Sequence, residues 1–132
     1  MKENEKGARK KILLVDDEAA VGLLLKNRLK STGVYEVRVE TKGTNALNAA
    51  RTFRPDLILL DIMMPDMDGS EVALQIKQDP AFQQTPFVFL SAAVTPEEIH
   101  ASRGRIGGQI FLAKPWDVKR LLECIEQCIQ GN

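Results

Sequence analysis

The sequence predicts one α/β domain, in which a doubly wound parallel sheet of five strands is flanked by five helices. Three observations lead to this fold class. The chain has 132 residues, enough for one ordinary domain with a buried core. From Lys11 onward, short apolar runs alternate with amphipathic stretches. The connections between them are short, and short right-handed crossovers produce a parallel sheet with helices on both faces.

Five segments are expected to be strands. Four of them are short apolar runs bounded by polar residues, which is typical of strands buried on both faces. The second segment alternates between apolar and polar residues, so we expect it at an edge of the sheet. In chain order the strands are residues 12–15, 35–40, 57–60, 87–90 and 110–113.

Five segments with helical spacing of apolar side chains are expected to be helices. In chain order they are residues 19–30, 45–53, 70–78, a short helix that Thr95 opens and a last helix that Asp117 opens. In the first of these, the side expected to face the core consists of Val21, Leu24, Leu25 and Leu29. Gly43 and Thr44 are expected to cap the second helix.

Composition excludes several classes of function. Lys plus Arg and Asp plus Glu number 18 each, so no net charge favours nucleic acid or a membrane surface. No apolar run approaches the roughly 18 residues of a membrane span, and we expect a cytoplasmic protein. The single histidine, His100, excludes two-histidine zinc sites, and Cys124 and Cys128 cannot form a disulfide framework. Residues 1–10 are expected to be a disordered tail, and residues 11–130 the domain.

Chemically active side chains follow four of the expected strands. Asp16 and Asp17 follow the first strand, Asp61 the third, Ser91 the fourth and Lys114 the fifth. In open parallel sheets, sites form beyond the carboxyl ends of the strands, so we expect these side chains to converge. Each alone also has a structural interpretation, because Asp and Ser commonly cap helices.

Three carboxylates gathered at one edge repel one another, and a divalent cation would relieve that repulsion. Carboxylates suit Mg²⁺ better than zinc, which prefers His and Cys. An ionised carboxylate is also a competent nucleophile for a phosphoryl group. A metal and a lysine would neutralise the phosphoryl oxygens, and a hydroxyl would donate to one of them. Asp61, Lys114 and Ser91 provide those three groups, which predicts a phosphoryl-transfer site.

Four motifs carry a resemblance to a known family. They are LVDDE at residues 14–18, LLDIMMPDMDG at 59–69, LSA at 90–92 and KP at 114–115. With these motifs the chain resembles the receiver domain of bacterial response regulators, the phospho-accepting half of two-component signalling. The resemblance runs from Lys11 to about Ile129. It implies the flavodoxin-like strand order 2-1-3-4-5.

The resemblance also implies roles for residues near the acceptor. Asp61 is expected to be the phospho-acceptor. Asp16 and Asp17 are expected to hold Mg²⁺ together with Asp61, and the backbone carbonyl of Met63 is expected to be a further ligand. Gly69 is expected to permit the turn before the third helix.

The resemblance implies a switch as well. Ser91 is the expected switch hydroxyl, Lys114 the lysine that pairs with the phosphoryl group, and Phe111 the aromatic switch. The fourth helix, fifth strand and fifth helix are expected to form the face that binds an output partner. The phosphoryl donor would be a sensor histidine kinase, a phosphotransfer protein or a small phosphodonor.

The expected role is that of a signalling phospho-acceptor rather than an enzyme, since the chain would promote only its own phosphorylation and dephosphorylation. Met63 and Ala93 would flank the approach of water to the acyl phosphate. Neither carries a carboxamide or carboxylate to orient that water, so we expect the phosphorylated state to hydrolyse slowly.

Two alternatives stay open at this point. The first is an aspartyl-phosphate phosphatase of the haloacid dehalogenase kind, although Met63 stands where that family has a second Asp. The second is a degenerate receiver that binds partners without phosphate. A nucleotide-binding fold is disfavoured, because no glycine-rich loop follows the first strand and Asp16 and Asp17 would repel a pyrophosphate.

Overall fold

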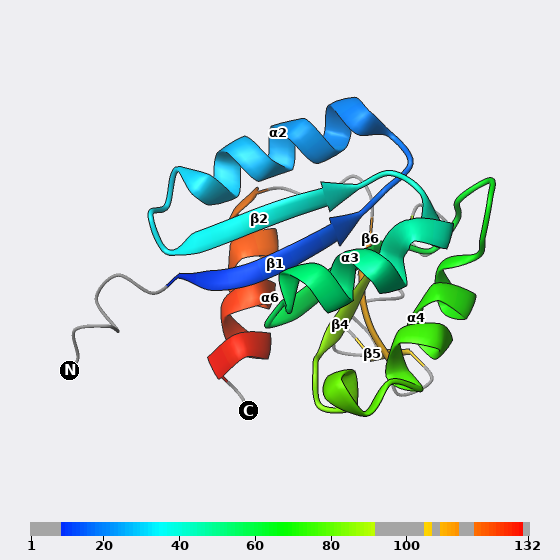
Figure 1. The fold of residues 1–132 in the computed structure, drawn as a ribbon. Coiled ribbons are helices and arrows are strands. Elements are labelled where there is room, and N and C mark those ends of the chain that lie inside the picture. The colour runs from blue at the N-terminus through cyan, green and yellow to red at the C-terminus, as the bar shows by residue number, and fades with distance from the viewer. Residues whose placement is uncertain (1–8, 92–104, 107–108, 114–117, 131–132) are drawn as a thin grey trace.

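The structure is a computed structural model, and it describes residues 9–91, 105–106, 109–113 and 118–130 (Figure 1). Its sheet has six strands in the order β2-β1-β3-β4-β6-β5. Five strands pair in parallel: β1 (Lys10–Val15), β2 (Tyr35–Glu40), β3 (Leu57–Asp61), β4 (Phe87–Ser91) and β6 (Gln109–Ala113). The sixth strand, β5 (Arg105–Ile106), pairs antiparallel with β6.

The described residues hold four α-helices and two short 3₁₀ helices. The α-helices are α2 (Ala19–Lys30), α3 (Ala46–Phe53), α4 (Gly69–Lys77) and α6 (Val118–Gln130). The 3₁₀ helices are η1 (Gly43–Asn45), directly before α3, and η2 (Pro80–Phe82), which follows α4.

The doubly wound α/β fold with a parallel sheet is therefore confirmed, whereas the count of five strands and five helices is not. The sixth strand escaped the sequence analysis because two residues are too short to show any periodicity. The expected helix that Thr95 opens lies outside the described residues.

The apolar runs of the strands are covered on both faces, as expected. Alternate residues of β1 point to opposite sides, so Ile12 and Leu14 pack with α2 and α6, whereas Leu13 and Val15 pack with α3 and α4. Figure 1 shows these two pairs of helices on opposite faces of the sheet. Because these strands pair in parallel, their carboxyl ends meet at one edge of the sheet.

Helix α2 packs largely with the expected face, since Leu29 is buried and Val21 packs against the core. Leu25 is buried as expected, but Leu24 is 59% exposed. Gly22 lies directly over the sheet, since a Cβ atom built on it would stand only 2.7 Å from the Cγ1 atom of Val39. Because glycine allows this close approach to β2, Gly22 takes a position that faces the sheet, and Leu24, two residues further along the helix, faces outward.

The first described strand begins inside the segment expected to be a tail. Lys10 is the first residue of β1, and its backbone N–H donates to the carbonyl of Val34 at 3.0 Å. The rest of that segment, residues 1–8, lies outside the described part. Among the described helices, none is both long enough and apolar enough to cross a membrane.

Candidate functional site

The carboxyl end of β1 brings two carboxylates to the edge of the sheet. Asp16 follows Val15, the last residue of the strand, and its backbone N–H continues the ladder to Glu40 at 3.0 Å. Its side chain is fully buried, and its Oδ1 atom accepts a hydrogen bond from the backbone N–H of Glu18 at 2.9 Å. Asp17 is exposed. One carboxylate is thus fixed in the protein, and its neighbour remains open to solvent.

The third carboxylate stands at the end of the neighbouring strand. Asp61 is the last residue of β3 and is 5% exposed. Its Oδ1 atom accepts a hydrogen bond from the backbone N–H of Met63 at 3.2 Å. The side chain of Met63 itself is 63% exposed.

The sheet brings these three carboxylates together. One oxygen atom each from Asp16, Asp17 and Asp61 lies within 4.8 Å of the other two. Carboxylate oxygens at such separations raise the free energy of the ionised state unless a cation lies between them. An all-oxygen donor set is the one that Mg²⁺ prefers, so the residues present fit this ion. The expected acid cluster is therefore present, although 45 residues separate Asp16 from Asp61 in the sequence.

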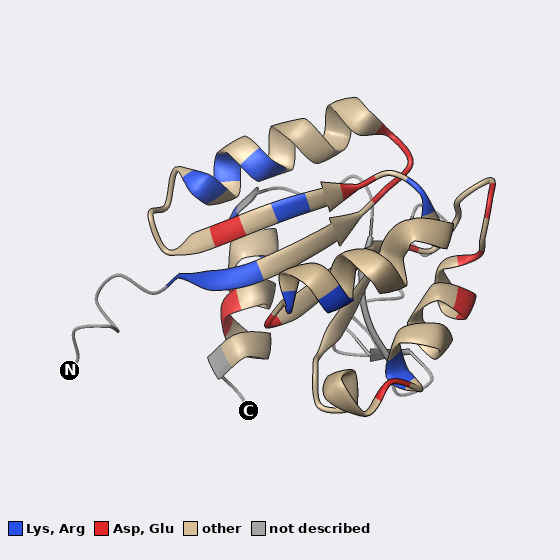
Figure 2. Cartoon of the chain, viewed as in Figure 1, with Lys and Arg blue, Asp and Glu red and all other residues tan. Residues whose placement is uncertain are grey.

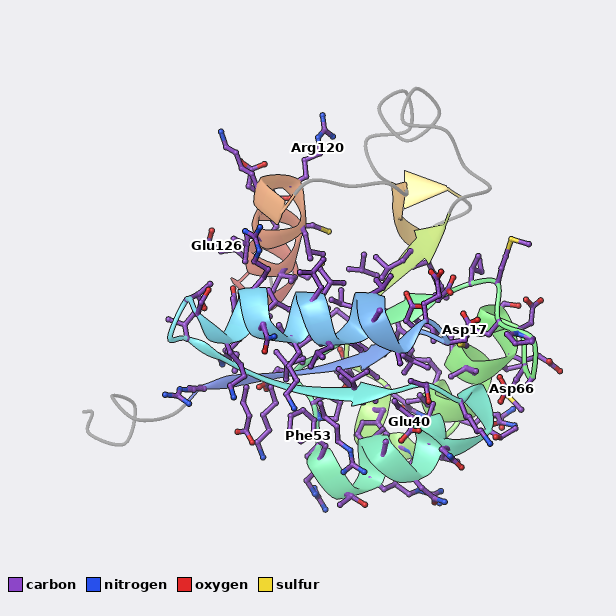
Figure 3. All side chains as sticks on the ribbon, turned by 90° about the horizontal axis from the view of Figure 1, so that it is seen from above. Asp17, Glu40, Phe53, Asp66, Arg120 and Glu126 are labelled. Atoms are coloured by element: carbon purple, nitrogen blue, oxygen red, sulfur yellow. The ribbon has the colours of Figure 1, made fainter. Side chains whose placement is uncertain are left out.

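Charge is distributed unevenly over the molecule despite the zero net charge. Figure 2 shows acidic residues at the β1–α2 loop, the end of β2 and the loop before α4, with Lys and Arg of α2 toward the opposite end. In Figure 3, Asp17, Glu40 and Asp66 lie toward the same end of the sheet. The acid cluster thus lies in a negative surrounding that would attract a cation.

The other expected site residues are described only in part. The backbone of Ser91 ends β4, one residue beyond Leu90, which pairs with Asp61. Phe111 pairs with Phe89 in the middle of β6. The side chains of Ser91 and Phe111 lie outside the described part, and so does all of Lys114. Strand pairing thus places the backbone of Ser91 next to that of the acceptor strand.

Gly69 serves the site for a different reason from the expected one. Among the described glycines only Gly33 has a positive φ, of 81°, so Gly69 does not need the left-handed conformation. Instead, Gly69 lies against the backbone of Asp61, and its N–H donates to the carbonyl of Ile62 at 2.9 Å. A Cβ atom there would stand 2.5 Å from the carbonyl oxygen of Asp61.

Asp66 is a residue of this region that the sequence analysis missed. Its carboxylate accepts hydrogen bonds from the backbone N–H groups of Gly43 and Thr44, and the Thr44 backbone bond is the main reason that the pKa of Asp66 is lowered. Gly43 and Thr44 were expected to cap the second helix. Instead, their own backbone N–H groups donate to Asp66, a carboxylate from another loop. No local pattern could reveal it, because the partners are 22 and 23 residues apart.

Comparison with known proteins identifies the family. Residues 12–126 match the family described as the response regulator receiver domain. The chain is 37% identical over 113 residues to the alkaline phosphatase synthesis transcriptional regulatory protein PhoP of Bacillus subtilis, a match covering 85% of this chain and 45% of PhoP. It is 31% identical over 118 residues to the polar-differentiation response regulator DivK of Brucella anthropi, covering 89% of this chain and 94% of DivK.

Solved structures agree with these matches. The chemotaxis protein CheY4 of Vibrio cholerae superimposes with a TM-score of 0.78 at 29% identity, covering 92% of this chain and 99% of CheY4. The chain spans about half the length of PhoP and of the DNA-binding response regulator MtrA of Mycobacterium tuberculosis, 45% and 52% respectively.

These comparisons favour neither the phosphatase nor the phosphate-independent alternative. The matched segment, residues 12–126, includes every strand end at which the sequence analysis placed a reactive side chain. The fold around those strand ends is the flavodoxin-like fold of the CheY4 structure. The chain belongs to the receiver domain family of two-component response regulators.

Proposed function

We propose that Asp61 of this chain accepts a phosphoryl group from a sensor histidine kinase or a phosphotransfer protein. A carboxylate oxygen of Asp61 would attack phosphorus, so that a P–O bond forms as the bond from phosphorus to the donor breaks. The observation that carries this proposal is the acid cluster, in which Asp16, Asp17 and Asp61 bring one oxygen each within 4.8 Å of the others.

The cluster is suited to Mg²⁺. Asp16, Asp17 and Asp61 would hold the ion together with the backbone carbonyl of Met63, and when bound it would neutralise negative charge on the phosphoryl oxygens. The N–H of Glu18 orients the buried Asp16 by donating to its Oδ1 atom, with one carboxylate oxygen of Asp16 within 4.8 Å of one oxygen each from Asp17 and Asp61. The exposed Asp17 leaves the cluster open to solvent, which gives both the ion and the donor a route to Asp61.

The remaining site residues would respond to the phosphoryl group. It adds about 1.5 to 2 negative charges and strong acceptor oxygens. Ser91 would donate its hydroxyl to one oxygen and Lys114 would pair with another. Phe111 would occupy the space that Ser91 vacates, which would alter the face formed by the expected fourth helix, β6 and α6. An output partner would bind there.

On this proposal the chain is a signalling phospho-acceptor that promotes only its own phosphorylation and dephosphorylation. Residues 11–130, together with Lys10 of β1, would form the receiver domain of a cytoplasmic protein. This chain itself would contact neither nucleic acid nor membrane, since its 18 basic and 18 acidic residues leave no net charge.

Intact mass measurement tests the proposal. The wild type and Asp61→Ala would be incubated with acetyl phosphate, with Mg²⁺ or with a chelator. We expect a mass increase of one phosphoryl group in the wild type with Mg²⁺ only. Asp79→Ala, which removes a carboxylate of the α4–η2 connection, serves as the matched control and should be phosphorylated normally. A wild type that gains no mass, or an Asp61→Ala variant that does, contradicts the proposal.

A further inference from the structure

The loop between β3 and α4, residues 62–68, begins directly after the acceptor and carries the backbone of Met63. Each end of the loop is fixed by its neighbours. At its start, the N–H of Met63 donates to the Oδ1 atom of Asp61 at 3.2 Å. At its end, the N–H of Gly69 donates to the carbonyl of Ile62 at 2.9 Å. These bonds close the loop, and the N–H of Ile62 attaches its start to β4 by donating to the carbonyl of Leu90 at 3.1 Å. None of these three bonds attaches the middle of the loop to the segment before α3.

Asp66 makes that attachment in the middle of the loop. Its Oδ1 atom accepts from the N–H of Gly43 at 3.3 Å, and its Oδ2 atom accepts from the N–H of Thr44 at 3.1 Å and from the Thr44 hydroxyl at 3.3 Å. Gly43 and Thr44 open η1, which leads into α3. The N–H groups of a first turn have no partners within their own helix, and neither Lys42 before η1 nor Asn45 before α3 provides a side-chain cap.

Packing fixes the loop at the same place. Gly43 is buried, and a Cβ atom built on it would stand 3.0 Å from Val72, 3.1 Å from the Cβ atom of Met67 and 3.3 Å from the Cε atom of Met64. The loop and α4 therefore pack closely on the start of η1, where a side chain at position 43 would have to displace its neighbours. The hydrogen bonds of Asp66 and the contacts of Gly43 are independent observations, and both tie the loop to α3.

We propose that Asp66 is a positioning residue for the phosphoryl site. By attaching the loop to the start of α3, it holds the backbone of Met63 where its carbonyl serves as a metal ligand, and so sets the affinity of the site for Mg²⁺. This inference rests on the proposed function. Groups that orient a metal ligand without touching the metal typically change metal affinity about 10-fold to 100-fold when removed.

The loop offers a matched control. Asp68 is an exposed carboxylate two residues from Asp66, and the bond described for it is a long one of 3.5 Å from the hydroxyl of Ser70, within the same connection. Asp66→Ala and Asp68→Ala therefore remove the same charge near the site, but only the first removes an attachment to α3. Asp66→Asn also removes the charge and keeps a carbonyl oxygen that accepts from Thr44.

Calorimetric titration with Mg²⁺ and the Mg²⁺ dependence of phosphorylation by acetyl phosphate would be measured for all four proteins. Asp66→Ala should bind Mg²⁺ about tenfold more weakly, whereas Asp68→Ala should remain within about threefold of the wild type. Asp66→Asn should lie closer to the wild type than Asp66→Ala does. Saturating Mg²⁺ should restore the phosphorylation rate of Asp66→Ala, because the nucleophile is intact.

The position of the Met63 backbone is also measured directly, in proteins that hold no metal. In ¹⁵N NMR spectra of the metal-free proteins, the amide of Met63 should shift in Asp66→Ala and stay in place in Asp68→Ala. Equal losses of Mg²⁺ affinity in both alanine variants would show that only the lost negative charge matters, and would overturn the inference. An Asp66→Ala variant that binds Mg²⁺ as tightly as the wild type would also overturn it. Should Asp66→Ala fail to fold, Asp66→Leu takes its place, since leucine keeps the volume of the side chain but offers no acceptor. Mg²⁺ affinity of Asp66→Leu equal to that of Asp68→Ala would then overturn the inference.

The inference and the proposed function fail in different ways. A wild type that gains no phosphoryl mass contradicts the proposed function itself. A wild type that is phosphorylated normally, beside an Asp66→Ala variant with unchanged Mg²⁺ affinity, contradicts only the role of Asp66.

Discussion

Gly69 lies directly against the phospho-acceptor expected at Asp61. A Cβ atom on Gly69 would stand 2.5 Å from the carbonyl oxygen of Asp61 and 2.6 Å from the Cα atom of Ile62. Both of those atoms are backbone, so a side chain at this position cannot be accommodated by rotating a neighbour. The first turn of α4 is thereby packed onto the proposed phospho-acceptor.

Gly69→Ala should displace the backbone of Asp61 or the start of α4. We expect the free energy of unfolding to fall by about 1 to 3 kcal/mol, as is usual for overpacking, and phosphorylation by acetyl phosphate to slow markedly. Urea unfolding and intact mass would measure the two effects.

Gly33→Ala is the control for that substitution. Gly33 has a φ of 81°, and a Cβ atom built on it would meet no other atom within 4 Å, so only conformational strain of about 1 kcal/mol is expected there. Its phosphorylation rate should match the wild type. Normal phosphorylation of Gly69→Ala would show that the contact with Asp61 does not matter for the site.

Arg54 offers a stabilising substitution. It ends α3 in the left-handed region, with a φ of 57° and a ψ of 65°, and its N–H donates to the carbonyl of Ala50 at 2.7 Å. Glycine adopts this conformation without the steric cost that other residues carry. Arg54→Gly should raise the free energy of unfolding by about 0.5 to 1 kcal/mol in urea titrations. Arg54→Ala keeps the strain and should show no such gain; equal stability of the two variants would refute the argument.

Asp79 should make stability depend on pH in the acid range. The N–H of Ala81 and then the side chain of Arg51, which donates to Asp79 at 2.9 Å, lower the pKa of Asp79 from its ordinary value of 3.8. This contribution is fully present above pH 3.8 and is lost as the pH falls through the lower pKa of the folded state, because the unfolded chain takes up the proton first.

Urea unfolding of the wild type and Asp79→Asn between about pH 5 and about pH 3 tests that dependence. The wild type should lose stability more steeply than Asp79→Asn does. Parallel curves for the two proteins would show that Asp79 is not a source of the acid sensitivity.

Met63 should govern the lifetime of the phosphorylated state. Its side chain is 63% exposed beside the acid cluster and carries no group that orients water. Met63→Glu introduces such a group, and we expect hydrolysis of the acyl phosphate to become faster by roughly tenfold. Loss of phosphoryl mass after removal of acetyl phosphate measures the rate, and Met63→Leu should hydrolyse like the wild type. A wild type that loses its phosphate as fast as Met63→Glu would contradict the expected slow hydrolysis.

Much of the fold could be predicted from the sequence, because the apolar patterns that mark strands and helices are local. Residues 35–40 alternate and form β2, and residues 19–30 have helical spacing and form α2. The acid cluster could also be predicted. Asp16 and Asp61 each follow an apolar run, and the carboxyl ends of the strands in a parallel sheet lie at one edge.

The features that escaped prediction depend on contacts between distant segments. The bonds from Gly43 and Thr44 to Asp66 cross from one loop to another, and the sequence around either loop is ordinary. The outward position of Leu24 follows from the approach of Gly22 to Val39, which no helical periodicity encodes. Local patterns therefore located the three carboxylates, whereas the contacts that hold the loop after Asp61 became visible only in the structure.

The central claim is that Asp16, Asp17 and Asp61 form one Mg²⁺-dependent phosphoryl site. A crystal structure grown with Mg²⁺ and beryllium trifluoride, which mimics the phosphoryl group, tests it most directly. We predict one Mg²⁺ ion bound by these carboxylates and the carbonyl of Met63, with beryllium trifluoride on Asp61 and the ammonium group of Lys114 in contact with it. Density for beryllium trifluoride elsewhere, or Asp17 and Lys114 directed away from Asp61, would contradict the account.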